Sequence, residues 1–124
     1  MPTPEQMVAV VQAYVDAFAA GDADAAAALF AEGATVEDPV GTPRKQGLDE
    51  IRAFYARSMA TGATLEMLGE PRCAADSVAF PFAVRLEWDG RPTTIEVIDT
   101  FRIDDAGKIT EMRAFFGPAN MKSA

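Results

Sequence analysis

In the first half of the chain, apolar side chains recur every three or four residues, the spacing that places them on one face of a helix. The first such stripe covers residues 7–18. It follows a capping box at residues 3–6 and precedes Gly21, a residue suited to end a helix. Asp22 then predicts the start of a second, Ala-rich helix that carries Phe30.

A short strand and a third helix are expected next. Residues 35–38 alternate between two faces, and Pro39 closes them as a strand. The third helix is expected over residues 48–60, with acidic side chains in its first turn, where the helix dipole favours them. Its expected inward side chains are Leu48, Ile51, Phe54, Tyr55 and Met59.

The second half of the chain alternates between apolar and polar residues, the period of a β-strand. Asp89-Gly90 favours a two-residue type I′ turn between two long strands. The expected strands are residues 64–70, 72–75 (joined to the start of the next), 78–88, 91–103 and 108–116. Helices followed by long antiparallel strands predict an α+β architecture with the helices packed on one face of the sheet.

Length and composition narrow the possible functions. The 124 residues suit one domain, residues 1–124, and the net charge of −8 argues against nucleic acid or an anionic membrane as partner. The absence of histidine excludes Ser-His-Asp catalysis and histidine-ligated metal sites, and the single Cys73 excludes an internal disulfide. With no apolar run that spans a bilayer and no signal peptide, we expect a cytoplasmic protein. If it is an enzyme, its chemistry is expected to use carboxylates, tyrosines or backbone groups, without a metal.

One acidic residue, Asp99, falls in the middle of an apolar strand face. The odd positions of residues 91–103 are mostly apolar, and a one-residue shift that moved Asp99 outward would also expose Ile95, Val97 and Phe101. A carboxyl group buried there avoids ionisation through a raised pKa and becomes a neutral O–H donor. Asp99 is therefore a candidate functional residue.

The neighbours of Asp99 follow from the lengths of two turns. A two-residue turn at Asp89-Gly90 places Phe80 opposite Asp99 on one side. A short second turn places Met112 on the other side, whereas a five-residue loop would place Arg113 there. The alternative to a functional role is a structural ion pair with an arginine. Strand parity disfavours it, because three arginines fall on the opposite face: Arg85, Arg102 and Arg113.

Three other polar residues lie on apolar faces. Tyr14 and Tyr55 belong to the stripes of the first and third helices and are able to bond to each other, which would polarise the outer hydroxyl as a donor. Otherwise they are ordinary core tyrosines. Asp38 shares a face with Val36, just before Pro39. It is either a structural turn residue or a carboxylate at a cavity edge that remains ionised and acts as a base.

Tyr14, Asp38 and Asp99, in this order and at these separations, resemble the catalytic residues of the bacterial ketosteroid isomerases (steroid Δ5–Δ4 isomerases). The surrounding sequence is also similar: TPE at 3–5, ATVEDPVG at 34–41, IRAFYA at 51–56, and MRA at 112–114 followed by FG at 116–117. The resemblance extends over essentially the whole chain. It implies the cone-shaped fold of the nuclear transport factor two-like superfamily, in which a curved mixed or antiparallel sheet surrounds a deep apolar cavity closed by three helices of the N-terminal half.

The resemblance also implies a role for each residue. Asp38 would move a proton from C4 to C6 of a Δ5-3-ketosteroid, while Tyr14 and protonated Asp99 would donate hydrogen bonds to the C3 oxygen. Tyr55 would support Tyr14, and Phe30 stands where some family members have a further tyrosine. No cofactor is implied. The residues expected to line the cavity and bind the substrate are Phe54, Phe82, Val84, Leu86, Trp88 (at the mouth), Phe101, Met112, Ala114 and Phe116.

The family resemblance further implies a homodimer formed through the outer face of the sheet, which would present Ile98, Thr100, Arg113 and Phe115 among others. Other functions occur on the same fold. Dehydratases use histidine, which is absent here. Epoxide hydrolases need an Asp-Arg-Asp cluster in the cavity, and by parity the arginines fall outside it. A non-catalytic binding module for a steroid-like ligand would keep the apolar cavity without a need for Asp38.

Overall fold

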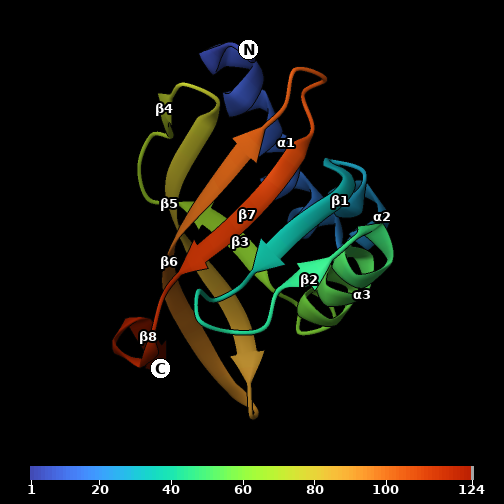
Figure 1. Cartoon of the computed structure of the whole chain (residues 1–124). Coiled ribbons are helices and arrows are strands. Elements are labelled where there is room, and N and C mark those ends of the chain that lie inside the picture. The colour runs from blue at the N-terminus through green and yellow to red at the C-terminus, as the bar shows by residue number, and fades with distance from the viewer. Residues whose placement is uncertain (124) are drawn as a thin grey trace.

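The computed structural model describes residues 1–123 and shows three α-helices against one face of a curved, eight-stranded sheet (Figure 1). The expected α+β class is confirmed. The helices are α1 (Pro4–Ala20), α2 (Ala23–Ala27) and α3 (Leu48–Met59), followed late in the chain by a 3-10 turn (Pro118–Asn120). The strands are β1 (Phe30–Glu37), β2 (Lys45–Gln46), β3 (Thr64–Met67), β4 (Arg72–Ala74), β5 (Ser77–Trp88), β6 (Arg91–Ile103), β7 (Ile109–Phe115) and β8 (Met121–Ser123).

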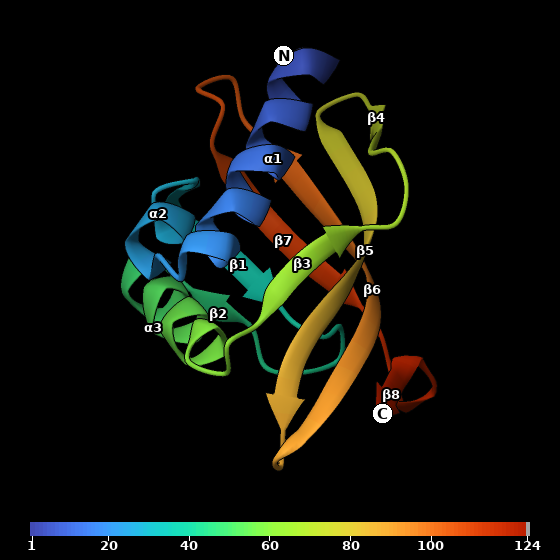
Figure 2. The same ribbon diagram turned by 180° about the vertical axis from the view of Figure 1, so that it is seen from behind.

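The strands follow the order β2-β1-β7-β6-β5-β3, with β4 beside β5 and β8 beside β6. Strand β1 runs parallel to β7, and the other neighbours are antiparallel, so the sheet is mixed. Within the described chain, the end strands β2 and β3 do not pair with each other, so the cone stays open. Figure 2 shows α1 lying across the sheet, with α2 and α3 near β1 and β2 and the β5–β6 hairpin projecting beyond them.

The cap residues around α1 act as predicted. The Thr3 hydroxyl accepts a hydrogen bond from the Gln6 backbone N–H at 3.1 Å, and the Gln6 side chain accepts one from the Thr3 N–H at 2.8 Å. Gly21 ends the helix with a left-handed φ of 63°, which glycine adopts without strain. The Asp22 carboxylate then accepts a hydrogen bond from the Ala25 N–H at 3.0 Å and starts α2.

The second helix is shorter than predicted. It ends at Ala27, and Phe30 already begins β1, although the sequence pattern indicated a strand only from residue 35. The carbonyl of Leu29 accepts a hydrogen bond from the Ile109 N–H at 2.9 Å, and Phe30 pairs with Ile109 in parallel register. Pairing with a strand near the C-terminus therefore outweighs the helix propensity of this Ala-rich segment.

The β5–β6 hairpin has the predicted register. Asp89 and Gly90 both have positive φ, 53° and 75°, as a type I′ turn requires, and Phe80 lies opposite Asp99. The helical stripe of α1 is buried against this hairpin and its neighbours, as expected. Leu48, expected to point inward, is exposed instead, because α3 starts at the surface near β2.

The predicted register between β6 and β7 was wrong by two residues. Ala114, not Met112, lies opposite Asp99, because the sheet is irregular between Arg102 and Ile103. The Asp104 carboxylate accepts hydrogen bonds from two backbone N–H groups of the turn and lengthens it. A shift of two residues keeps every side chain on its face, so the inward direction of Asp99 is unaffected.

Short strands account for the remaining differences. β2 and β8 were not predicted, because two or three residues carry no readable alternation. β3 ends at Met67 rather than at residue 70. Residues 72–74 form a strand of their own, β4, which folds back onto β5 after the left-handed Ala75. Among the helices of residues 1–123, none combines the length and apolar character needed to cross a membrane.

Candidate active site

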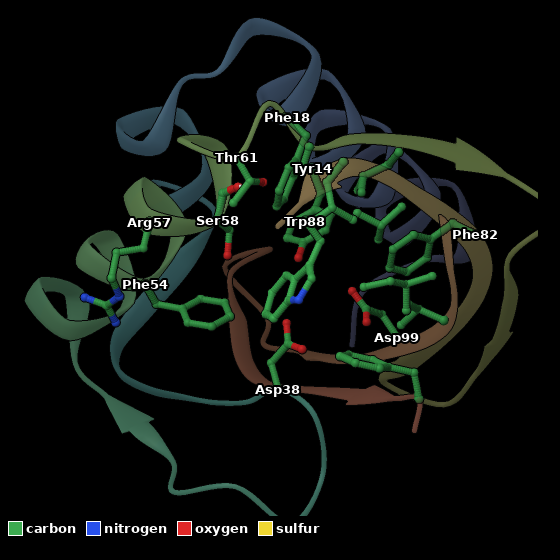
Figure 3. A pocket seen from close by; sticks show the side chains of 17 residues that line it. Tyr14, Phe18, Asp38, Phe54, Arg57, Ser58, Thr61, Phe82, Trp88 and Asp99 are labelled. Atoms are coloured by element: carbon green, nitrogen blue, oxygen red, sulfur yellow. The ribbon is translucent and has the colours of Figure 1, made fainter. Parts of the chain in front are cut away.

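A deep pocket of about 540 Å³ lies between the helices and the concave face of the sheet, within the usual size range of small-molecule sites. Its lining is mostly apolar. Three acidic or phenolic side chains from distant parts of the chain face it: Tyr14 from α1, Asp38 from the end of β1 and Asp99 from β6 (Figure 3). The pocket thus brings together the three residues that the sequence singled out.

Tyr14 has a tyrosine partner, as the sequence suggested. Its hydroxyl lies 3.1 Å from the hydroxyl of Tyr55, and the two rings pack edge to face. Tyr55 is completely buried behind Tyr14, and the ring of Phe30 lies 5.7 Å from the ring of Tyr55. If Tyr55 donates to Tyr14, the proton of Tyr14 is free to point into the pocket. Burial, together with the neighbouring Tyr55 and the two aspartates, raises the pKa of Tyr14 well above 10, so this hydroxyl remains a donor.

Asp99 is a buried acid without a hydrogen-bond partner. Only 1% of its surface is exposed, and neither carboxyl oxygen has a partner within the described chain. Burial and, second, the charge of Asp38 raise the pKa of Asp99 well above its ordinary value, while the nearby Tyr14 hydroxyl acts in the opposite direction without reversing the shift. The raised pKa favours the neutral form of Asp99, in which the carboxyl group carries an O–H that faces the pocket.

No arginine forms an ion pair with Asp99 in the described chain, so the structural alternative is wrong. The three strand arginines lie on the outer face of the sheet, as parity predicted. Each of them faces an acidic side chain there, at separations of 2.9, 3.9 and 3.1 Å: Arg85 with Glu66, Arg102 with Asp76, and Arg113 with Glu37.

Asp38 faces the same pocket but differs from Asp99 in its surroundings. It is only partly exposed, and the apolar walls of the pocket bury most of its carboxylate away from water. This burial raises the pKa of Asp38 to about 6, and the positive charge of Lys45 limits the rise. At neutral pH Asp38 is therefore mostly a carboxylate whose basicity is suited to proton transfer. The pocket thus combines one carboxyl group with a pKa of about 6 and two groups, Tyr14 and Asp99, whose raised pKa values favour their protonated forms.

The sequence predicted part of the apolar lining. Six of the nine expected residues line the pocket: Phe54, Phe82, Val84, Leu86, Trp88 and Phe116. Trp88 lies near the hairpin tip with 58% of its surface exposed, consistent with a place at the mouth.

Phe101, Met112 and Ala114 do not line the pocket, so this expectation was wrong for them. They lie on the expected face of the sheet, but they are buried in the core instead of facing the pocket. The ring of Phe101 packs 5.1 Å from the ring of Tyr14 and 5.0 Å from that of Phe80. All three residues belong to the buried core.

Other lining residues were missed by the sequence analysis. Ile95 and Val97 share the apolar face of Asp99, so strand alternation already contained the signal for them. The end of α3 and the following turn contribute the polar residues Arg57, Ser58 and Thr61, which no pattern indicated. The expectation that the arginines lie outside the cavity therefore needs correction for Arg57. Figure 3 shows its guanidinium directed away from Asp38 and Asp99.

We expect the variant Asp99→Asn to have a stability that depends less on pH than that of the wild type. Because the pKa of Asp99 is raised in the folded state, the native protein holds a proton that the unfolded chain has released. The free energy of unfolding therefore falls as pH rises above the ordinary pKa of 3.8, by up to about 1.4 kcal/mol per pH unit, until Asp99 ionises in the native state.

Urea unfolding at about pH 7 and 8.5 measures this difference, because Asp38, with a pKa of about 6, contributes little in that range. The wild type should lose more stability than Asp99→Asn between the two pH values. Equal losses in both proteins would mean that native Asp99 is already ionised at neutral pH.

Comparisons with known proteins show what the chain is similar to. A family model described as a SnoaL-like domain matches residues 11–112. A steroid Delta-isomerase of Nocardioides simplex is 38% identical over 116 residues, which cover 94% of each chain. A solved structure, described as the epoxide hydrolase/cyclase-like enzyme SalBIII in pyran ring formation in polyether salinomycin, superposes with a TM-score of 0.94 at 28% identity and covers 100% of both chains.

These relatives limit the range of activities to be considered, and they also agree with the observed fold. The steroid Delta-isomerase supports an isomerase activity for this chain, and SalBIII shows that a similar fold also occurs in an epoxide hydrolase/cyclase-like enzyme. On the extent of these matches, the chain belongs to the SnoaL-like family of the nuclear transport factor two-like superfamily and is a relative of the steroid Δ-isomerases.

Proposed function

We propose that the protein moves the double bond of Δ5-3-ketosteroids to the Δ4 position. The observation that carries this proposal is the arrangement of one carboxylate and two neutral donors, Asp38 with Tyr14 and Asp99, around one apolar pocket. A ketone already acidifies the C–H bonds beside it, so the reaction needs a positioned base and a site for the developing oxyanion. The pocket offers both.

The proton transfer balances within the substrate. The Asp38 carboxylate takes a proton from C4, the electrons move into the C3–C4 bond, and the C3 oxygen becomes a dienolate oxyanion. Tyr14 and neutral Asp99 donate hydrogen bonds to that oxygen. Protonated Asp38 then returns its proton to C6, which leaves the double bond between C4 and C5 and restores the ketone. Asp38 ends the cycle as a carboxylate.

The apolar walls serve the same reaction. They bury the hydrocarbon skeleton of a steroid, and they exclude water from the oxyanion site, where hydrogen bonds are stronger than in bulk solvent. Because the unpartnered O–H of Asp99 is already in place, it needs no reorganisation when the charge forms.

The experiment that tests this function incubates the purified protein with 5-androstene-3,17-dione and follows the ultraviolet absorbance of the conjugated 4-ene-3-one. We expect a rapid rise at protein concentrations far below that of the substrate. Tight binding of a steroidal phenol such as equilenin without any rise would instead indicate a non-catalytic binding module. Absence of both activity and binding would contradict a steroid site.

The similarity to SalBIII favours a second candidate, the opening of an epoxide. In that reaction neutral Asp99 would protonate the epoxide oxygen while the Asp38 carboxylate removes a proton from the attacking hydroxyl. The position of Arg57 at the rim, turned away from both acids, makes this candidate the weaker one. Conversion of a steroidal or polyketide epoxide without ketosteroid isomerisation would reverse this ranking.

We also propose that two copies of the chain associate through the outer face of the sheet. Ile98 on β6 and Phe115 on β7 lie opposite each other and are 50% and 42% exposed, so they present adjoining apolar surface. Analytical ultracentrifugation should show a dimer for the wild type. Phe115→Glu should weaken the association by at least about 30-fold, because it places a charge in the centre of the contact.

The matched control is Leu68→Glu, which changes an equally exposed apolar residue after β3. It should leave the association constant unchanged. A wild type that sediments as a monomer, or a Phe115→Glu variant that still dimerises with the same affinity, would contradict this interface.

A further inference from the structure

The base of the proposed reaction lies at the start of a loop that is held from outside the pocket. Asp38 directly follows β1, and the chain continues through Pro39 and Val40 to Gly41 before it reaches β2. Along β1 the side chains alternate, so Val36 points into the core while Glu37 points to the outer face. The residue next to the base therefore contacts the opposite side of the sheet.

Glu37 connects this loop to the sheet with both of its carboxylate oxygens. Oε2 accepts a hydrogen bond from the Gly41 backbone N–H at 3.0 Å. Oε1 accepts one from Nε of Arg113 on β7 at 3.1 Å, and the guanidinium of Arg44 lies 3.8 Å from the same oxygen. Only 14% of the Glu37 side chain is exposed, which is low for an acid on an outer face.

The loop has few other attachments. The Val40 N–H donates to the Ala114 carbonyl at 2.8 Å and extends the ladder between β1 and β7 by one bond. The backbone N–H and the hydroxyl of Thr42 both donate to the Pro39 carbonyl, within the loop itself. Gly41 has a φ of 102°, a left-handed conformation that turns its N–H toward Glu37. The bond to Glu37 is thus the side-chain contact that links the turn after Asp38 to the sheet.

Glu37 is ionised over the pH range in which Asp38 gains or loses its proton. The hydrogen bond from Gly41 lowers the pKa of Glu37 most, and the hydrogen bond and charge of Arg113 and the charge of Arg44 lower it further; burial of the carboxylate opposes them only in part. The anchor therefore keeps the same charge state over the pH range in which the base changes its own. Its strength should not vary across that range.

We propose that Glu37 is a positioning residue, which acts through Asp38 by holding the 38–41 loop against β7. The effect of Glu37 on turnover rests on the proposed isomerase function, whereas its effect on the loop does not. A base that serves two carbon atoms of one substrate must lie within contact distance of both, and a displacement of about 1 Å is enough to cost up to about 100-fold in rate. Loss of the anchor should therefore lower turnover while substrate binding is unaffected.

The kinetic test compares Glu37→Ala and Glu37→Gln with a matched control. Glu37→Ala should lower kcat by about 10- to 100-fold with KM and equilenin affinity unchanged. Glu37→Gln should lose less, because its amide oxygen is still able to accept the Gly41 N–H. The control is Glu66→Gln, which breaks the ion pair with Arg85 (2.9 Å) on the outer face of the sheet, away from the loop. It should leave kcat unchanged.

A double-mutant cycle separates positioning from general loss of structure. In the Asp38→Asn background, Glu37→Ala should have no further effect on the residual rate, since there is no base left to position. An equal fold-loss in both backgrounds, or wild-type kcat in Glu37→Ala, would overturn the proposal.

Amide hydrogen exchange tests the anchor without reference to turnover. The Val40 and Gly41 amides should exchange at least about 10-fold faster in Glu37→Ala than in the wild type, and at the wild-type rate in Glu66→Gln. Wild-type exchange of these amides in Glu37→Ala would overturn the proposal even in an active enzyme. If these amides exchange faster in Glu37→Ala but the wild type has no isomerase activity, the result would support the role of Glu37 as an anchor and contradict the proposed function.

Discussion

Asp38→Asn should lower kcat for the isomerisation by about 10²–10⁴-fold, the contribution expected of a positioned general base. The change replaces the carboxylate with an amide of nearly the same shape, so the pocket and its apolar walls stay as they are. Because the amide accepts no proton at neutral pH, the C4 proton has no acceptor in the pocket. Equilenin should bind as tightly as before, since in the proposed site its phenol would contact Tyr14 and Asp99.

Initial rates from the ultraviolet assay, together with a fluorescence titration of equilenin, measure the two effects separately. Asp16→Asn, on the exposed side of α1, is a matched control and should behave as the wild type. If Asp38→Asn kept more than about a tenth of the wild-type kcat, another group would have to serve as the base and the proposed mechanism would be wrong.

Tyr14→Phe should lower kcat by about 10²–10³-fold, the usual cost of removing one donor to an oxyanion. The hydroxyl is the only part removed, and the ring stays packed against Phe18 and Phe101. The dienolate would then be stabilised by Asp99 alone. Since Tyr55 is left without its partner at 3.1 Å, its hydroxyl becomes a buried, unsatisfied group, so a modest loss of stability is also expected.

The control for this prediction is Tyr55→Phe, which removes the supporting hydroxyl but keeps Tyr14. Its effect on kcat should be several-fold at most, because Tyr14 still donates to the substrate. The pair of variants is compared by kcat per molecule that binds equilenin, which corrects for unfolded protein. Equal losses in both variants would indicate that the tyrosine pair acts as a structural unit and not through a donor at Tyr14.

Much of the site could be predicted because two strong local signals coincide in the β5–β6 hairpin. The Asp89-Gly90 turn determines which residues of β5 and β6 face each other, and alternation determines which face is buried. Together they place Asp99 inside, opposite Phe80. The partner of Asp99 on β7 could not be predicted, because the irregularity near Ile103 and the turn built on the Asp104 side chain leave no regular pattern.

Other features depend on contacts between distant segments. Phe30 reads as part of an Ala-rich helix, yet it begins β1 because β7 supplies a parallel partner. Glu37 reads as an ordinary surface acid. Its bond to Gly41 in the loop is local, but the bond that ties Glu37 to the sheet arises because β1 lies beside β7, which brings Arg113 next to it.

Sequence patterns alone predict the α+β class, the inward faces of the long strands and the candidate residues Tyr14, Asp38 and Asp99. Periodicity and turn chemistry are local properties, so they can be read from neighbouring residues. Which inward residues line the pocket and which fill the core depends instead on how the helices pack against the sheet. Phe82 and Phe101 share one sheet face, but α1 covers Phe101 and leaves Phe82 beside the open pocket. Alternation shows the direction of a side chain, whereas the distance between helix and sheet depends on the packing of the whole chain.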